Sequence, residues 1–379
     1  MSGRIYLDYN ATSVVRPQAE AAVLAALRLG ANASSIHAAG RTARAMIEES
    51  REAVATLAGA RPQDVVFTSG GSEANALAID SAVRAGNRRL IVGATEHASV
   101  LDTAAASGAR VELWPVDSNG VADLGWLADR LKRWKAEDGR PFVAVMAANN
   151  ETGVVQPVTE IAALVHEAEG WLHVDAVQAS GKIPIDAIPA DTMAISAHKI
   201  CGPQGSGALI VGCDVELTRR AFGGGQERGR RGGTENLSGI AGFGAAARAV
   251  STTAGPDLAA WRDAAAERLK AEAGVVVLGE AAPRLPNTLC FAAPGFSSEL
   301  QVMALDLAGV MVSAGAACSS GKVKSSHVVD AMGQGELGAC SLRVSGGWAT
   351  IEADWRQFVE AWLQAHARQS SRTRSIVEA

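Results

Sequence analysis

Two charged side chains each follow an apolar segment of the chain. Lys199 comes shortly after the apolar residues 193–195 and before a Gly/Pro turn, and Asp175 closes the apolar run 171–174. Burying a charge without a partner is costly, so each residue calls for either a functional explanation or an exposed position. A buried amine can be neutral and nucleophilic, as a Schiff-base lysine must be. The alternatives are a surface lysine and an aspartate that caps a helix or binds a metal.

Together, a strand-end aspartate and a strand-end lysine favour pyridoxal phosphate chemistry. In enzymes that use this cofactor, an aspartate pairs with the pyridinium nitrogen and lets the ring accept electrons. Gly70, Gly71 and Ser72 lie between a predicted strand and a predicted helix. Glycines let the backbone approach a phosphate, and a helix N-terminus supplies free N–H groups. The same residues would also fit an ordinary turn between a strand and a helix, with Ser72 as the helix cap.

Neutral or aromatic polar residues follow other predicted strands. His97 ends the segment 95–97, and its flat ring could stack on a pyridine ring. Asn150 and Gln178 carry amides, which suit hydrogen bonding to the cofactor's phenolic oxygen without adding charge. Each of these residues could instead be a turn former.

The elements that would position these residues alternate along the chain. Apolar runs predict strands at 64–68, 90–92, 111–114, 142–146, 171–174, 193–195 and 207–211, with helices at 17–29, 40–57, 72–84, from about 100, and 161–168. This order predicts an α/β fold with a largely parallel sheet and helices on both faces. Such sheets bind ligands at the carboxyl ends of their strands.

The length of 379 residues predicts two domains. We expect a large α/β domain at 15–255, a smaller α+β domain formed by 1–14 and 256–367, a hinge near 251–256 and an unstructured polar tail at 368–379. In the smaller domain, helices are predicted at 258–271 and 299–307, and strands at 287–291 and 341–344. The formal net charge of -5 gives no electrostatic reason to expect nucleic acid or an anionic membrane as a partner.

The five cysteines are far apart in sequence, and no CxxC pair occurs. This pattern disfavours a bound metal and a disulfide framework, and it fits a reducing cytoplasm. No apolar run approaches the length that a membrane-spanning helix needs, and no signal sequence is evident. Cys318 lies among small residues at 313–321, which predict a mobile loop that carries an accessible thiol. We expect the other cysteines, Cys201, Cys213, Cys290 and Cys340, to be packing residues.

A series of short motifs is spread over almost the whole chain. They read YLDYNAT at 6–12, FTSGGSE at 67–73, TEH at 95–97, NNETG at 149–153, HVDAVQ at 173–178, SAHK at 196–199, GGGQERG at 223–229 and AACSSG at 316–321. As an ordered set they resemble the NifS/IscS-like cysteine desulfurases, which are class V enzymes of the fold type I pyridoxal-phosphate group. The resemblance implies a seven-stranded-type sheet in the large domain, with Cys318 carried by the smaller one.

The resemblance also implies how the cofactor would be held. Lys199 would hold pyridoxal phosphate covalently, Asp175 would pair with the ring nitrogen, His97 would stack on the ring, and Gln178 would bond the phenolic oxygen. The phosphate would be bound by Gly71, Ser72, Ser196 and His198. Thr234 matches a residue that reaches the phosphate of the partner subunit in this family, which implies a homodimer.

For the reaction, the resemblance implies conversion of L-cysteine to L-alanine. Asn150 and Arg343 would bind the substrate, because a guanidinium offers paired donors to a carboxylate. Lys199 would act as the base at Cα, His97 would transfer protons, and Cys318 would take the sulfur as a persulfide. The sulfur would pass to an iron–sulfur scaffold or a sulfur-carrier protein.

The sequence departs from the family pattern at several positions: Gln226 replaces a frequent His, Ala316 a Ser, Cys201 a Tyr, and Asn75-Ala76 an Asp-Asn or Asn-Asn pair. The alternatives to a desulfurase are a selenocysteine lyase or another class V aminotransferase-like enzyme, and a catalytically silent scaffold with this fold. Cys318 argues against an aminotransferase, which needs no nucleophilic thiol. The complete set of Lys199, Asp175 and Cys318 argues against a silent scaffold.

Overall fold

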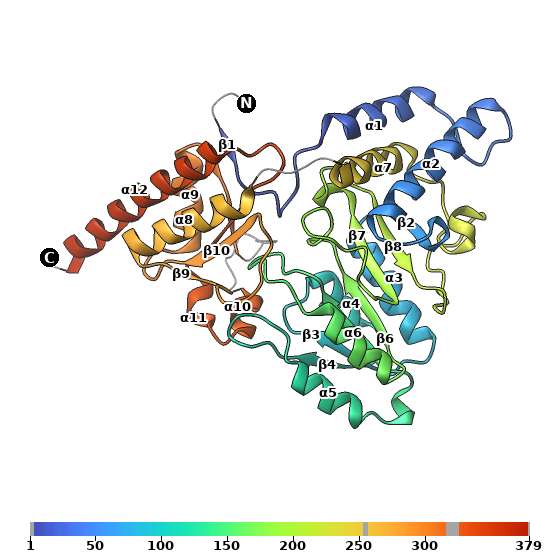
Figure 1. The fold of residues 1–379 in the computed structure, drawn as a ribbon, viewed down its shortest axis with the longest axis horizontal. Helices are drawn as coiled ribbons and strands as arrows, with labels where there is room; N and C mark the ends of the chain where they lie inside the picture. The colour runs from blue at the N-terminus through green and yellow to red at the C-terminus, as the bar shows by residue number, and fades with distance from the viewer. Residues whose placement is uncertain (1–3, 253–256, 316–325, 378–379) are drawn as a thin grey trace.

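The computed structural model describes residues 4–252, 257–315 and 326–377, which form a larger and a smaller lobe (Figure 1). The larger lobe contains a seven-stranded sheet in the order β2-β8-β7-β6-β5-β3-β4. Its strands are β2 (Val65–Thr68), β3 (Arg89–Gly93), β4 (Arg110–Trp114), β5 (Phe142–Met146), β6 (Trp171–Asp175), β7 (Thr192–Ser196) and β8 (Gly207–Val211). Of these, only β8 runs antiparallel to its neighbours. The predicted mostly parallel sheet is therefore confirmed.

Helices cover both faces of this sheet, because successive strand side chains point to opposite sides. Val66 and Val92 pack into clusters that include residues of α3 (Gly71–Arg84) and α4 (Ala98–Ala106). On the other face, Phe67 clusters with residues of α2, α5, α6 and α7, and α1 packs against α7. These helices are α1 (Pro17–Leu29), α2 (Ala38–Leu57), α5 (Leu124–Lys132), α6 (Val158–Glu167) and α7 (Leu237–Thr252).

The smaller lobe has a four-stranded sheet in the order β12-β13-β10-β9, which comprises β9 (Val276–Val277), β10 (Thr288–Ala292), β12 (Ser313–Ala314) and β13 (Ser341–Ser345). Helices α8 (Leu258–Ala273), α9 (Ser298–Leu307) and α12 (Glu352–Val377) pack against it around Phe291 and Trp362. The short helices α10 (His327–Ala331) and α11 (Gly335–Gly338) complete the lobe. None of the helices in the described ranges is long and apolar enough to cross a membrane.

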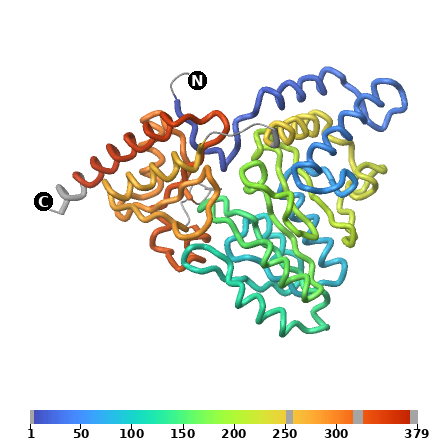
Figure 2. The backbone as a smooth tube through the Cα atoms, viewed as in Figure 1, coloured from blue at the N-terminus to red at the C-terminus, as the bar shows by residue number. Residues whose placement is uncertain are grey.

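Both ends of the described chain lie in the smaller lobe. Strand β1 (Ile5–Tyr6) pairs in parallel with β11 (Val310–Met311), and α12 ends the chain on the same lobe (Figure 2). The pairing supports a division into 15–255 on one side and 1–14 with 256–367 on the other. We propose these boundaries for the two domains.

Some sequence predictions are wrong. Helix α12 continues to Val377 where an unstructured tail was expected from 368, because a helix that is already nucleated can extend through polar residues. Cys213 is exposed after β8, whereas Cys201, Cys290 and Cys340 are buried as predicted. The predicted loop at 313–321 begins with a strand, β12. Cys318, the rest of that loop and residues 253–256 of the predicted hinge lie outside the described residues.

Candidate active site

A cavity of about 360 Å³ brings together most of the predicted site residues. It is lined by Gly71, Ser72, His97, Asn150, Asp175, Gln178, Ser196, His198, Lys199 and Arg343. Its size lies within the usual range for a small-molecule site. Most of these residues follow the carboxyl ends of strands of the large sheet, whereas Arg343 comes from β13 of the smaller lobe. The cavity therefore lies where the two lobes meet.

Lys199 ends a short 3-10 turn, Ala197–Lys199, directly after β7. Its Nζ donates to the backbone oxygens of Asn10, at 2.5 Å, and Ala11, at 2.8 Å. Burial lowers the pKa of Lys199 to about 8, and the positive charge of Arg343 contributes to the decrease. The amine is therefore closer to its neutral, nucleophilic form than an ordinary lysine is.

Asp175 is the buried last residue of β6. Its Oδ2 accepts a hydrogen bond from Asn75 Nδ2 at 2.8 Å, and its Oδ1 accepts one from the backbone N–H of Val177 at 2.9 Å. No ion pair joins Asp175 to a cationic residue in the part of the chain that the structure describes. Neutral donors thus orient a carboxylate that can still pair with a cationic ring nitrogen.

The N-terminus of α3 forms the part of the cavity that suits a phosphate. The helix begins at Gly71, and Gly70 before it makes no side-chain cap, so the first N–H groups of the helix are available. A Cβ on Gly71 would lie 2.6 Å from Val177 Cγ2, which explains why a glycine is needed here. Burial, together with the charges of Lys199 and Lys182, lowers the pKa of His198 to about 4. His198 is therefore neutral and would bind a phosphate through a hydrogen bond.

His97 is positioned by its place at the start of α4. As the N-cap of that helix, its Nδ1 accepts from the backbone N–H of Ser99 at 3.1 Å and lies 2.8 Å from the Ser99 hydroxyl. These contacts fix the orientation of an exposed ring that lines the cavity. Stacking of this ring on a cofactor stays a prediction.

Gln178 belongs to a network that the sequence analysis missed. Its Nε2 donates to the backbone oxygen of Asn10 at 2.9 Å, and its Oε1 accepts from Lys182 Nζ at 2.5 Å. Lys182 also donates to Asn10 Oδ1 at 3.0 Å. Burial lowers the pKa of Lys182 well below its ordinary value, with contributions from Lys199 and Arg343. Asn10 lies inside the YLDYNAT motif, and this was the only sequence signal for the network.

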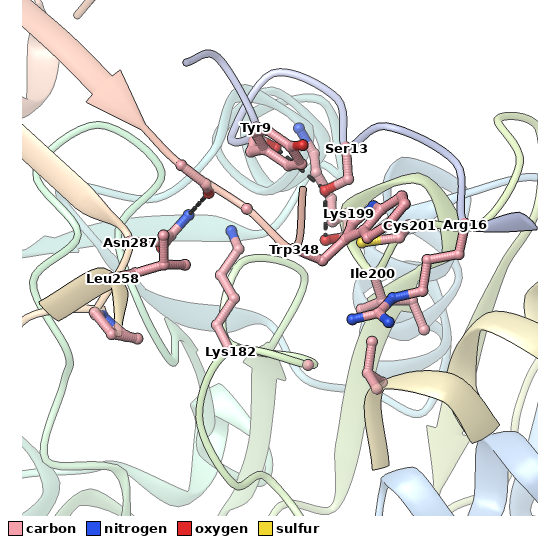
Figure 3. Close-up of a pocket in the computed structure, with 15 residues that line it drawn as sticks. Tyr9, Ser13, Arg16, Lys182, Lys199, Ile200, Cys201, Leu258, Asn287 and Trp348 are labelled. Carbon is pink, nitrogen blue, oxygen red and sulfur yellow. Dashed lines mark hydrogen bonds between the residues drawn. The ribbon is translucent and has the colours of Figure 1, made fainter. Parts of the chain in front are cut away.

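A second cavity, of about 220 Å³, lies on another side of Lys199 (Figure 3). Lys182, Arg16, Cys201 and Trp348 line it, and the Arg16 guanidinium stacks over the Trp348 ring at 5.2 Å. Because Lys199 lines both cavities, its side chain is reached from two directions. Lys182 lines this second cavity, whereas its hydrogen-bond partners Asn10 and Gln178 line the first.

The predicted substrate residues come from both lobes. Arg343 is buried, and its Nη2 donates to Asp8 Oδ1 at 2.9 Å while its Nη1 donates to the backbone oxygen of Asn150 at 3.1 Å. The Nε of Arg343 is buried without a hydrogen-bond partner. A buried donor of this kind is costly to leave unpaired, so it suits an incoming anionic group.

One predicted residue in the described part of the chain, Thr234, does not line the 360 Å³ cavity. Thr234 is exposed and lines a separate hollow of about 230 Å³ with Arg231 and Glu235. Its contact with a partner subunit stays a prediction. Cys318 lies outside the described residues. Within those residues, no cluster of His, Cys, Asp and Glu is arranged to hold a metal ion.

Comparisons with known proteins identify the family of the chain. The model of the aminotransferase class-V family matches residues 5–357. The chain is 41% identical to a cysteine desulfurase of Cereibacter sphaeroides, with 87% of each chain covered, and 36% identical to an IscS-like cysteine desulfurase of Mycobacterium tuberculosis, with 96% of each covered. The structure of a NifS-like protein from Rickettsia africae superposes with a TM-score of 0.88 at 31% identity, over 96% of this chain and 99% of that one. The chain therefore belongs to the class-V aminotransferase family and, within it, to the cysteine desulfurases.

Proposed function

We propose that the chain is a pyridoxal-phosphate-dependent cysteine desulfurase. It converts L-cysteine to L-alanine and retains the sulfur as a persulfide on Cys318. The observation that carries the proposal is the single cavity in which Lys199, Asp175 and Arg343 meet. The Cys-containing motif at 316–321 and the desulfurase relatives support the choice of reaction.

The residues of the cavity fit pyridoxal phosphate. The carboxylate of Asp175 would hold the ring nitrogen, and the N-terminus of α3 with Ser72 and Ser196 would hold the phosphate. Gln178 Nε2 would donate to the phenolic oxygen, since its Oε1 is already occupied by Lys182. When bound, the cofactor withdraws electrons from the substrate carbon atoms that lose a proton and a sulfur.

The chain's own groups then orient the substrate and move its protons. The unpaired Nε of Arg343 binds the substrate carboxylate between the two lobes, with Asn150 beside it. Lys199, with a pKa of about 8, is basic enough to take the Cα proton, and its neutral fraction near neutral pH is far larger than that of an ordinary lysine. His97 at the cavity wall exchanges protons with the substrate.

Sulfur transfer is assigned to Cys318 from the sequence. Its thiolate forms a bond to the substrate sulfur while the substrate Cβ–S bond breaks, and the electron pair of that bond stays on Cβ. A proton added to Cβ completes alanine, and Cys318 is left as the persulfide. The net change is L-cysteine plus a thiol to L-alanine plus a persulfide. The persulfide then transfers its outer sulfur to an iron–sulfur scaffold or a sulfur-carrier protein.

The quaternary state and location complete the proposal. We infer a homodimer, in which the exposed Thr234 reaches the phosphate site of the partner subunit. The exposed hollow with Arg231 and the family relatives support this arrangement. We also infer a cytoplasmic enzyme, because its relatives include IscS-like proteins and its cysteines form no disulfide pattern.

The decisive experiment measures alanine and sulfide released from L-cysteine in the presence of pyridoxal phosphate and a thiol reductant. The wild-type protein should release equimolar amounts of both. Lys199→Ala should lose the visible absorbance of the bound cofactor and all turnover. Cys318→Ala should keep that absorbance but lose sulfide release.

Cys213→Ser is the matched control for the thiol, because Cys213 is the exposed cysteine among the described residues. It should retain wild-type turnover. A Cys318→Ala protein that released sulfide at the wild-type rate would refute the persulfide mechanism. A wild-type protein that bound the cofactor but produced no alanine would refute the desulfurase assignment.

A further inference from the structure

A line of hydrogen-bonded side chains runs through the sheet to Asp175. Trp171 Nε1 donates to Thr192 Oγ1 at 2.9 Å, and Thr192 Oγ1 lies 3.0 Å from His173 Nδ1. On the other side of the ring, His173 Nε2 lies 3.0 Å from Asn75 Oδ1, and Asn75 Nδ2 donates to Asp175 Oδ2 at 2.8 Å. All of these side chains are buried, from 0% exposed for His173 to 6% for Asp175. Water therefore does not set the direction of these hydrogen bonds.

The Asp175 end of the line sets its direction, because an ionised carboxylate can only accept. At the other end, the indole N–H of Trp171 donates to Thr192 Oγ1, which leaves the Thr192 hydroxyl able to donate to His173 Nδ1. Asn75 Nδ2 donates to Asp175 and to Ser99 Oγ, at 2.9 Å, so Asn75 Oδ1 faces His173 and needs a donor. In this order His173 would carry its proton on Nε2 and accept at Nδ1 from the Thr192 hydroxyl, whereas a proton on Nδ1 would use the backbone oxygen of Thr192 as its acceptor. Burial lowers the pKa of His173 to about 3, so the ring holds a single proton.

The direction matters for the charge on Asp175. In the order described, an N–H group of Asn75 points at the carboxylate, and hydrogen bonds to an ionised group stabilise that ionised form. If His173 carried its proton on Nδ1, Asn75 would turn its amide to satisfy Nε2. Its carbonyl oxygen would then face the carboxylate and favour the protonated acid.

We propose that His173 is a positioning residue that holds an N–H group of Asn75 towards Asp175, with its own tautomer supported by Thr192 and Trp171. The inference rests on the proposed function in one respect, namely that the cation served by Asp175 is the ring nitrogen of pyridoxal phosphate. None of Trp171, Thr192 and His173 lines the cavity, so these residues act only through Asn75 and Asp175.

A purely structural role for His173 makes a different prediction. The ring stacks on Phe142, with centroids 6.3 Å apart and planes at 15°, and an aromatic packing role would not depend on which nitrogen carries the proton. The tautomer therefore separates the two roles. It is measured by long-range nitrogen–proton NMR on the full chain with labelled histidine and without cofactor.

Of the seven histidines, His173 is assigned by the signal that disappears in His173→Gln. We expect a neutral ring protonated on Nε2 in the wild-type chain across neutral pH. A ring protonated on Nδ1, with a donor bond directed towards Thr192, would overturn the proposal. Because no cofactor or substrate is present, this measurement is independent of whether the chain desulfurates cysteine.

The second test uses two variants of Thr192, which contacts the His173 ring on the side away from Asn75. Thr192→Val removes the hydroxyl with little change in volume, whereas Thr192→Ser keeps it. Thr192→Val should shift the tautomer towards Nδ1 and lower kcat about tenfold with KM within about twofold, the effect of weakening one hydrogen bond to a charged group. It should also move the pH midpoint of the bound cofactor's absorbance, and Thr192→Ser should match wild type in all three readouts.

If Thr192→Val does not fold, His173→Gln and His173→Leu replace it. A glutamine amide can donate to Asn75 from the position of Nε2, whereas leucine cannot. His173→Gln should keep kcat within about threefold, and His173→Leu should lose at least about tenfold. Equal kcat values and equal absorbance midpoints for the two variants would overturn the proposal. Alanine release by the wild-type chain, measured alongside, tests the proposed function separately.

Discussion

The amine of Lys199 lies 2.5 Å from the backbone oxygen of Asn10, and this contact pairs the amine with a neutral dipole instead of a carboxylate. Burial therefore lowers the pKa of Lys199 to about 8, and the attraction of Asp8 and Asp175 offsets the decrease only in part. The N-terminal segment thus holds the amine in place, while the lowered pKa lets the amine lose its proton. A lysine that must react with an aldehyde needs this combination.

The first prediction concerns the pH dependence of cofactor capture. Only the neutral amine attacks an aldehyde, and a lowered pKa makes the neutral form available at lower pH. The capture rate of the cofactor-free chain should rise with pH to half its maximum at about 8, instead of about 10.4 for an unperturbed lysine. Stopped-flow absorbance with pyridoxal phosphate between about pH 7 and about pH 10 measures it.

The positive charge of Arg343 contributes to the low pKa of Lys199, and this contribution can be removed by mutation. Arg343→Met should move the midpoint to higher pH, because the neighbouring positive charge no longer disfavours protonation of Lys199. Arg356→Met on α12 is the control, since Arg356 is exposed and pairs with Glu352 far along the smaller lobe. The explanation fails if both variants keep the wild-type midpoint.

The second prediction concerns the stability of the segment that precedes Thr234. Arg51 of α2 donates to both carboxylate oxygens of Glu227 at 2.8 Å, and these side chains are 4% and 2% exposed. Glu227→Gln would leave the buried Arg51 guanidinium with only the more exposed Glu48, at 3.1 Å from its Nε, as a counter-charge. We expect a decrease of about 3–5 kcal/mol in the free energy of unfolding, measured by denaturant titration.

The exposed pair of Arg61 and Asp64 provides the control for this ion pair. The two side chains are joined at 2.8 Å, but Arg61 is 58% exposed. Arg61→Gln should leave the denaturation curve close to that of the wild type, because water screens the pair and competes with it. Equal losses for Glu227→Gln and Arg61→Gln would contradict the assignment of Arg51–Glu227 as a structural anchor.

Sequence patterns predicted the strands of the large sheet well, because each strand of a buried parallel sheet is an apolar run that ends in polar residues. Lys199, Asp175 and His97 could be placed at strand ends for the same reason. Helix α7 was missed because its many Gly and Ala residues hide the helical pattern. Its close contact with α2 explains them: a Cβ on Gly244 would lie 2.5 Å from Ser50 Cα.

The second layer of the site could not be predicted from local patterns. Asn10 and Asn75 bond to residues far away in sequence, at separations of 168 residues for Gln178 and 100 for Asp175. A neutral amide gives no local sign of such a partner. His173 was read as part of a motif, but its role depends on a donor direction that only the folded arrangement determines.

The third prediction concerns Asn10 as a link between the lobes. Its Oδ1 accepts from Lys182 and from Asn287 Nδ2, and its Nδ2 donates to Thr288 Oγ1. Asn10→Ala removes one hydrogen-bond partner from each of Lys182, Asn287 and Thr288, so we expect a loss of about 2–3 kcal/mol in the free energy of unfolding. Asn32→Ala, in an exposed loop, should cost less than about 0.5 kcal/mol. Indistinguishable denaturation curves for the two variants would argue against this linking role.

The last prediction concerns the glycine at the start of α3. A Cβ on Gly71 would approach Val177 Cγ2 to 2.6 Å, so Gly71→Ala must displace either Val177 or the first turn of the helix. We expect the affinity for pyridoxal phosphate, measured by absorbance titration, to fall at least about tenfold. Gly70→Ala should bind pyridoxal phosphate as tightly as the wild type, because nothing lies within 4 Å of a Cβ at Gly70.

Adding Val177→Ala to Gly71→Ala separates two causes of the loss. If the clash with Val177 displaces the helix start, the smaller side chain should restore most of the affinity, because the first N–H groups of α3 return to their positions. If the added methyl itself blocks the phosphate, the double variant should stay as weak as Gly71→Ala. Wild-type affinity in the single variant would show that the phosphate is bound elsewhere, and the assignment of the α3 N-terminus would then be wrong.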